Sequence, residues 1–104
     1  MNDRTYEEKN FDHSLFDELL SSRLRLAVMS VLLGCKKIEF TLLREKVAAS
    51  DGNLAVHCKK LEEAGYITSE KTFVDRKPLT LYAATPKGRR AVKAYAEHLA
   101  ALLK

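Results

Sequence analysis

The sequence predicts one mainly α (α+β) domain, in the order helix, short strand, two helices, hairpin and long helix. Three observations predict it. Apolar residues recur at helical spacing in successive stretches, two β-rich runs flank a charged turn, and 104 residues suffice for one domain of ordinary composition. Residues 1–10 are polar and charged, so we expect a disordered N-terminal tail and a domain over residues 11–104.

Two helices are expected before residue 35. Ser14 is the expected cap of the first, at about residues 11–21. The second has apolar residues at i, i+3, i+4, i+7 and i+8, the spacing of a core-facing helix, and Gly34 is expected to end it. The apolar residues are Phe11, Leu15, Leu19 and Leu20 in the first helix, and Leu24, Ala27, Val28, Val31 and Leu32 in the second.

A short strand at residues 38–40 and two further helices follow. Thr41 is the expected cap of the first of these helices, and Ser50 or Asp51 the cap of the second, which is expected from about Gly52 to Ala64. The residues expected to face the core are Leu42, Leu43 and Val47 in the first helix, and Leu54, Cys58 and Leu61 in the second.

The last third of the chain predicts a hairpin and a helix. Residues 67–73 and 79–84 have strand composition and flank a charged turn at residues 74–78. Thr85 and Pro86 are typical of a helix start. The apolar side of this helix, which is expected to reach the C-terminus, consists of Val92, Tyr95, Ala96, Leu99, Leu102 and Leu103. This order is that of a winged helix-turn-helix with a two-stranded wing and an extra helix at each end.

Three passages resemble a known family. Residues 61–67 (LEEAGYI) resemble the end of the recognition helix in MarR-like and ArsR-like regulators. Residues 80–89 (TLYAATPKGR) resemble their passage from the wing to the last helix, and residues 23–32 (RLRLAVMSVL) resemble their first helix. Ala84 departs from the family, which usually has Leu there. The resemblance, from about Phe11 onward, is to stand-alone winged helix-turn-helix transcriptional regulators. It implies a sequence-specific DNA-binding protein, and we expect a repressor.

The charge distribution agrees with a polyanionic partner. The net charge of +4 combines −4 in residues 1–20 with +8 in residues 21–104. Residues 71–93 alone carry +6, with seven basic side chains against Asp75. Charge alone leaves open whether these side chains bind a polyanion or form a solvated surface. The helix order and the resemblance favour duplex DNA.

The helix at residues 52–64 is expected to enter the major groove, and the hairpin tip to contact the minor groove. Asn53 suits an adenine edge, Ala55 and Val56 suit thymine methyl groups, and Lys59 and Lys60 suit phosphates. The expected DNA-binding residues are Asp51, Gly52, Asn53, Ala55, Val56, Lys59, Lys60, Arg76 and Lys77. For Lys87, Arg89, Arg90 and Lys93, a DNA backbone contact and a solvated surface remain equally open.

The two added helices, at about residues 11–21 and 86–104, are expected to form a homodimer on a pseudo-palindromic operator. Packing against their own domain is the alternative. The expected dimerisation residues are Phe11, Leu15, Leu19, Tyr95, Leu99, Leu102 and Leu103.

Other site types are not favoured. Cys35, His57 and Cys58 are poorly spaced for a metal, and we expect structural thiols; His13 and His98 are isolated. We expect no cofactor, no metal site and no enzyme. No membrane segment or secretion signal is found, and two cysteines suit the cytoplasm. A small-molecule or redox effector stays open, and a winged-helix protein-interaction module is the alternative function.

Overall fold

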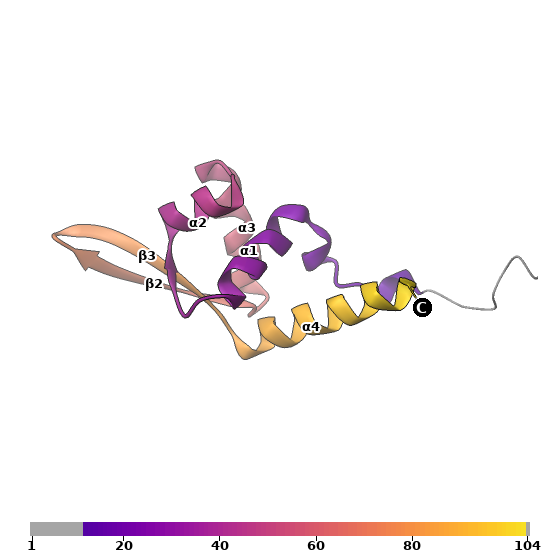
Figure 1. Ribbon diagram of the computed structural model, residues 1–104. Helices are drawn as coiled ribbons and strands as arrows, with labels where there is room; N and C mark the ends of the chain where they lie inside the picture. The colour runs from indigo at the N-terminus through magenta and orange to yellow at the C-terminus, as the bar shows by residue number, and fades with distance from the viewer. Residues whose placement is uncertain (1–11, 104) are drawn as a thin grey trace, which may run out of the picture.

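The computed structural model describes residues 12–103, which form a three-helix body with a hairpin and a helix extending from it in opposite directions (Figure 1). The body consists of α1 (Arg23–Leu33), α2 (Phe40–Val47) and α3 (Asp51–Glu63). The strands are β1 (Ile38–Glu39), β2 (Ile67–Val74) and β3 (Lys77–Ala84), and α4 (Pro86–Ala100) is the extending helix. Three 3-10 turns complete the fold: η2 (His13–Leu15), η3 (Leu19–Ser21) and η4 (Ala101–Leu103). The expected tail and Phe11 lie outside the described residues.

The mainly α (α+β) class and the winged helix-turn-helix order are confirmed, and the expected short strand is β1, at the base of the wing. The antiparallel sheet has the order β1-β3-β2. Ile38 pairs with Tyr82, and the β2–β3 register runs from Ile67 with Ala84 to Val74 with Lys77. Short β1 therefore anchors the base of the wing and leaves its far end two-stranded.

The wing turn is tighter than expected. Asp75 and Arg76 have φ angles of 51° and 67°, so both adopt the left-handed conformation of a type I′ turn. Lys77 is consequently the first residue of β3 and pairs with Val74, instead of lying within a longer turn.

One apolar core joins the helices to the sheet. The expected seam of α3 is confirmed, because its three residues are almost fully buried. Leu42, expected to face inward, is 43% exposed, whereas Leu43 beside it is fully buried. Met29 of α1 and Leu20 of η3 also belong to the core. The core consists of Leu20, Val28, Met29, Leu32, Ile38, Leu43, Leu54, Cys58, Leu61, Ile67 and Tyr82.

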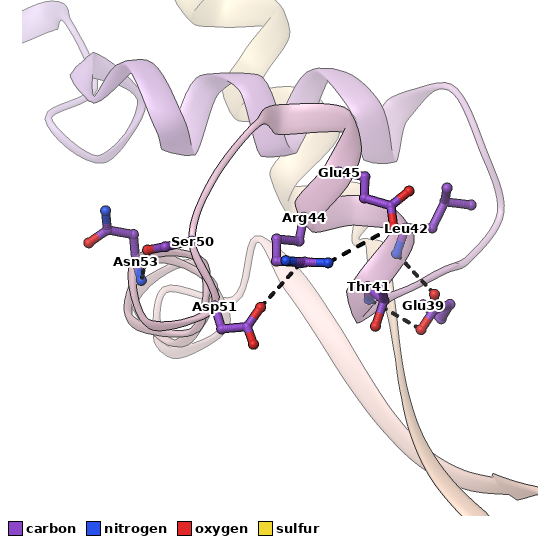
Figure 2. Close-up of polar contacts among 8 residues, drawn as sticks. All are labelled: Glu39, Thr41, Leu42, Arg44, Glu45, Ser50, Asp51 and Asn53. Atoms are coloured by element: carbon purple, nitrogen blue, oxygen red, sulfur yellow. Dashed lines mark hydrogen bonds and ion pairs between the residues drawn. The ribbon is translucent and has the colours of Figure 1, made fainter.

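Side-chain caps fix where the helices begin. Ser50 caps α3 through the amide of Asn53, and Thr85 caps α4 ahead of Pro86, both as expected. The expectation that Thr41 caps α2 is wrong. The Glu39 carboxylate accepts from the amides of Thr41 (3.2 Å) and Leu42 (2.9 Å), and α2 begins at Phe40 (Figure 2). A carboxylate at this end also suits the positive end of the helix dipole.

The segment before α1 differs most from the sequence prediction. Instead of a continuous helix to residue 21, the described part consists of the turns η2 and η3. The Asp12 carboxylate accepts from the amide of Ser14 (2.9 Å), and the Asp17 carboxylate from that of Leu19 (2.8 Å). These local bonds occupy amides that a helix would need. Ser14 is therefore not a helix cap, and the apolar residues of this segment do not share one helical face.

The start of α4 packs closely on the end of α3 and the first residues of the wing. Thr85 donates its hydroxyl to the Gly65 carbonyl (2.6 Å) and its amide to the Tyr66 carbonyl (3.0 Å). A Cβ atom at Gly88 would lie 2.2 Å from that same Tyr66 oxygen, so only glycine fits without a shift. The far end of α4 lies beside the segment around η2 (Figure 1). There the Phe16 and Tyr95 rings pack edge-on, with their centroids 5.9 Å apart.

Candidate nucleic-acid interface

The outer surface of α3 carries most of the expected DNA-binding side chains. Leu54, Cys58 and Leu61 face the core, which turns the intervening residues toward solvent. Exposed along this helix are Asp51, Gly52, Asn53, Ala55, Val56, Lys59 and Lys60. The structure thus brings seven of the nine expected residues together on one helix. The N-terminal turn offers polar groups, the middle offers apolar ones, and two lysines follow.

An ion pair joins the second half of α2 to the first residue of α3 (Figure 2). Arg44 of α2 reaches across to α3, with its Nε 3.2 Å from Oδ1 of Asp51. A terminal guanidinium nitrogen lies 3.9 Å from the carboxylate of Glu45. Arg44 was not among the residues expected to bind DNA. Its only sequence signal is a charge seven residues before Asp51, across an intervening turn.

The wing carries the remaining two expected residues. Arg76 at the turn and Lys77 at the start of β3 are both exposed. Beside them, the Phe73 and Val74 side chains are also exposed. At the base of the wing, Lys37 forms an ion pair with Glu70 at 2.8 Å. The tip therefore combines two cations with an apolar surface.

The basic cluster at the start of α4 divides into two parts. The Lys87 ammonium group lies 5.8 Å from the centre of the Tyr66 ring, a cation–π contact that gives this lysine a structural role. Arg89, Arg90 and Lys93 are exposed. Lys87 is exposed as well, so the question that the sequence left open stands for all four residues.

His57 connects the middle of α3 to α1. An Arg25 terminal nitrogen lies 2.8 Å from Nδ1 of His57, while Arg25 Nε donates to the Leu19 carbonyl at 2.6 Å. Because a guanidinium can only donate, Nδ1 accepts and carries no proton. Burial, followed by the charges of Arg25 and Lys60, lowers the pKa of His57. His57 is therefore a neutral link between helices.

The thiols and histidines form no metal site within residues 12–103, where no group of three or more His, Cys, Asp or Glu side chains is placed to hold an ion. Burial raises the pKa of the Cys58 thiol to about 11, which makes thiolate formation unfavourable. Cys35 is half-buried, and its thiol donates to the Val31 carbonyl at 3.5 Å.

Among residues 12–103, none of the helices is long and apolar enough to cross a membrane.

The expected dimerisation residues lie around an open groove between α4 and the segment around η2. Tyr95, Leu99 and Leu102 line it from the side of α4, and His13 and Phe16 from the other side. Leu15 and Leu103 are exposed outside the groove lining, and Leu19 is half-buried. The described part of the chain thus leaves several large apolar side chains uncovered at this end.

Comparison with known proteins identifies the family. A model of the winged helix DNA-binding domain matches residues 24–103. An uncharacterized protein of Methanocaldococcus jannaschii is 37% identical over 78 residues, which cover 75% of this chain and 85% of that protein. A transcriptional regulator homologue from Pyrococcus horikoshii is 29% identical, with a TM-score of 0.78, over 84% of this chain and 86% of its own.

MarR-family structures share the fold. The structure of a mutant of ZitR from Lactococcus lactis, a zinc-responsive MarR family member, was solved in complex with DNA. It is 24% identical, with a TM-score of 0.59, over 79% of this chain and 54% of its own. The chain therefore belongs to the winged helix DNA-binding domain family, and it is a DNA-binding transcriptional regulator with a MarR-like fold.

Proposed function

We propose that this protein binds a specific site on double-stranded DNA as a homodimer and represses transcription by occupying a promoter. One observation carries the proposal: the exposed surface of α3 presents Asn53, Ala55 and Val56 ahead of Lys59 and Lys60. The major groove admits one helix, whose N-terminal side chains reach base edges while basic residues meet phosphates. The protein acts in the cytoplasm, where its free cysteines remain reduced.

The wing supplies the second contact. A type I′ turn projects the Arg76 guanidinium from the tip of the hairpin, with Lys77 next to it. A narrow minor groove concentrates negative potential and attracts such a group. ZitR, which shares the fold, was solved with DNA, and this supports the same partner here.

The groove between α4 and the segment around η2 supports the dimer. Leu99 and Leu102 expose apolar surface there, away from α3 and the wing (Figure 1). A second copy that covers this surface would pair two recognition helices, and two-fold DNA readers bind pseudo-palindromic operators in this way.

The test is a titration of the purified protein against promoter fragments at several salt concentrations. We expect the logarithm of the binding constant to fall linearly with the logarithm of the salt concentration, because each cation on a phosphate releases counterions. Arg76→Ala should weaken binding about fivefold or more without changing the fold. Lys36→Ala, which removes an equal charge outside α3 and the wing, is the control.

Two outcomes would contradict the proposal. Unchanged affinity of Arg76→Ala would remove the wing from the mechanism. If the wild-type protein failed to retard duplex DNA but captured an acidic protein, the chain would instead be a winged-helix protein-interaction module.

A further inference from the structure

Arg44 lies between two carboxylates, where α2 meets the first turn of α3 (Figure 2). Its Nε edge faces Asp51 at 3.2 Å, and Glu45 lies farther away, 3.9 Å from a terminal nitrogen. Within residues 12–103, Arg44 side-chain atoms are engaged only through these ion pairs. The Asp51 carboxylate thus orients the guanidinium, and the terminal N–H groups keep hydrogen-bonding capacity.

Stability of the fold does not explain this arrangement. The Asp51 side chain is 76% exposed and that of Glu45 is 62% exposed, and ion pairs in such surroundings contribute little to folding. The Arg44 side chain is the least exposed of the three, at 35%. Its position is therefore held by neighbouring groups at the surface, beside the first turn of α3.

The net charge around Arg44 indicates whether it would contact a phosphate or a base edge of DNA. Two carboxylates around one guanidinium give the group a net charge of −1, which repels a phosphate. A base edge carries no net charge. Guanine presents O6 and N7 in the major groove, two acceptors that match the parallel N–H groups of an oriented arginine.

The middle of α3 has no side chain that could recognise guanine, and Arg44 could supply one. Ala55 and Val56 have no side-chain hydrogen-bonding group, so they can contact thymine methyls but cannot discriminate guanine through hydrogen bonds. We propose that Arg44 reads a guanine in the major groove and that Asp51 is its positioning residue. This inference rests on the proposed function, because it requires the first turn of α3 to lie in that groove.

The experiment selects bound sequences from a random duplex pool with the wild-type protein, Arg44→Ala, Asp51→Asn and Lys46→Ala. The wild-type site should contain one guanine per half-site whose preference falls roughly 5- to 150-fold in Arg44→Ala, the range of one bidentate pair. Preferences at the other positions should persist. Asp51→Asn should relax the same guanine by a smaller factor, a change that a merely structural role would not confine to one base pair.

Lys46→Ala is the matched control. Lys46 belongs to α2 and has the same charge, but its position two residues after Arg44 places it about 200° around the helix. It should leave every base preference unchanged. Thermal unfolding of each variant shows whether the fold is retained.

The possible failures are distinguishable. A uniform loss of affinity in Arg44→Ala, with all base preferences kept and a shallower salt dependence, would make Arg44 a phosphate contact and overturn the inference alone. Unchanged preferences and affinity would also overturn it alone. A wild-type protein that binds no duplex would overturn both this inference and the proposed function.

Discussion

Gly88 shows how one residue lets the start of α4 pack directly against the backbone at Tyr66. The Tyr66 carbonyl that a Gly88 Cβ would meet at 2.2 Å is held in place, because it also accepts the amide of Thr85. The Met29 methyl group, 2.9 Å from the same point, belongs to the core. A side chain at this position therefore meets backbone on one side and a packed core on the other.

Gly88→Ala is expected to lower the free energy of unfolding by about 1–3 kcal/mol, the cost of forcing extra volume into a packed interior. The free energy is measured by urea denaturation with linear extrapolation. Gly52→Ala is the control, since a Cβ there meets no atom within 4 Å, and stability should stay level or rise by up to about 1 kcal/mol. Equal losses in both variants would contradict the close contact at Gly88.

Single elements were predictable where periodicity governs them. The buried seam of α3 and the hairpin of β2 and β3 follow from spacing and residue type alone. Elements whose limits depend on one acidic side chain could not be predicted in this way. Asp12 and Asp17 replace the expected helix before α1 with two turns, and Glu39 starts α2 two residues earlier than expected.

The candidate interface shows the same division. Periodicity predicts which residues of α3 face solvent, because it identifies those that face the core. It cannot predict that Asp51 holds Arg44 from another helix, or that His57 accepts from Arg25 of α1. Both contacts depend on how two helices meet, and the local sequence does not encode that geometry.

The cap of α2 can be tested directly. Glu39→Ala should lower the free energy of unfolding by about 0.5–2 kcal/mol, because two amides at the start of the helix lose their acceptor. Thr41→Ala should change it by no more than about 0.5 kcal/mol. Urea denaturation compares the two variants. A larger loss for Thr41→Ala would mean that the threonine is the cap after all.

For the whole molecule, the segment before α1 links the expected dimer surface to the proposed DNA-binding surface. The Tyr66 hydroxyl, next to the wing, donates to the Asp17 carboxylate. Arg25 joins the Leu19 carbonyl to His57 of α3, and Phe16 packs against Tyr95 of α4. A dimer formed through this region would therefore set the separation of the two recognition helices.

We expect the double variant Leu99→Asp and Leu102→Asp to be monomeric, because it places charge on exposed apolar residues of α4 and η4. Its affinity for a two-half-site operator should fall by about 100-fold or more, since the second half-site no longer binds intramolecularly. Sedimentation equilibrium measures the mass and a retardation assay measures the affinity.

Ala94→Asp is the matched control, because it adds the same charge at an exposed position of α4 outside the apolar side. It should remain dimeric. A wild-type protein that sediments as a monomer while bound to its operator would rule out the dimer.

The turn at the tip of the wing has an evolutionary consequence. Arg76, with a φ of 67°, adopts a conformation that glycine reaches freely and that costs a residue with a Cβ atom about 1 kcal/mol or more. The cost falls on the two-stranded end of the hairpin, where little else holds the strands together. The residue that would fold best there lacks the guanidinium that the minor groove attracts. Under the proposed function, selection for a more stable hairpin and selection for tighter DNA binding therefore oppose each other at this one position.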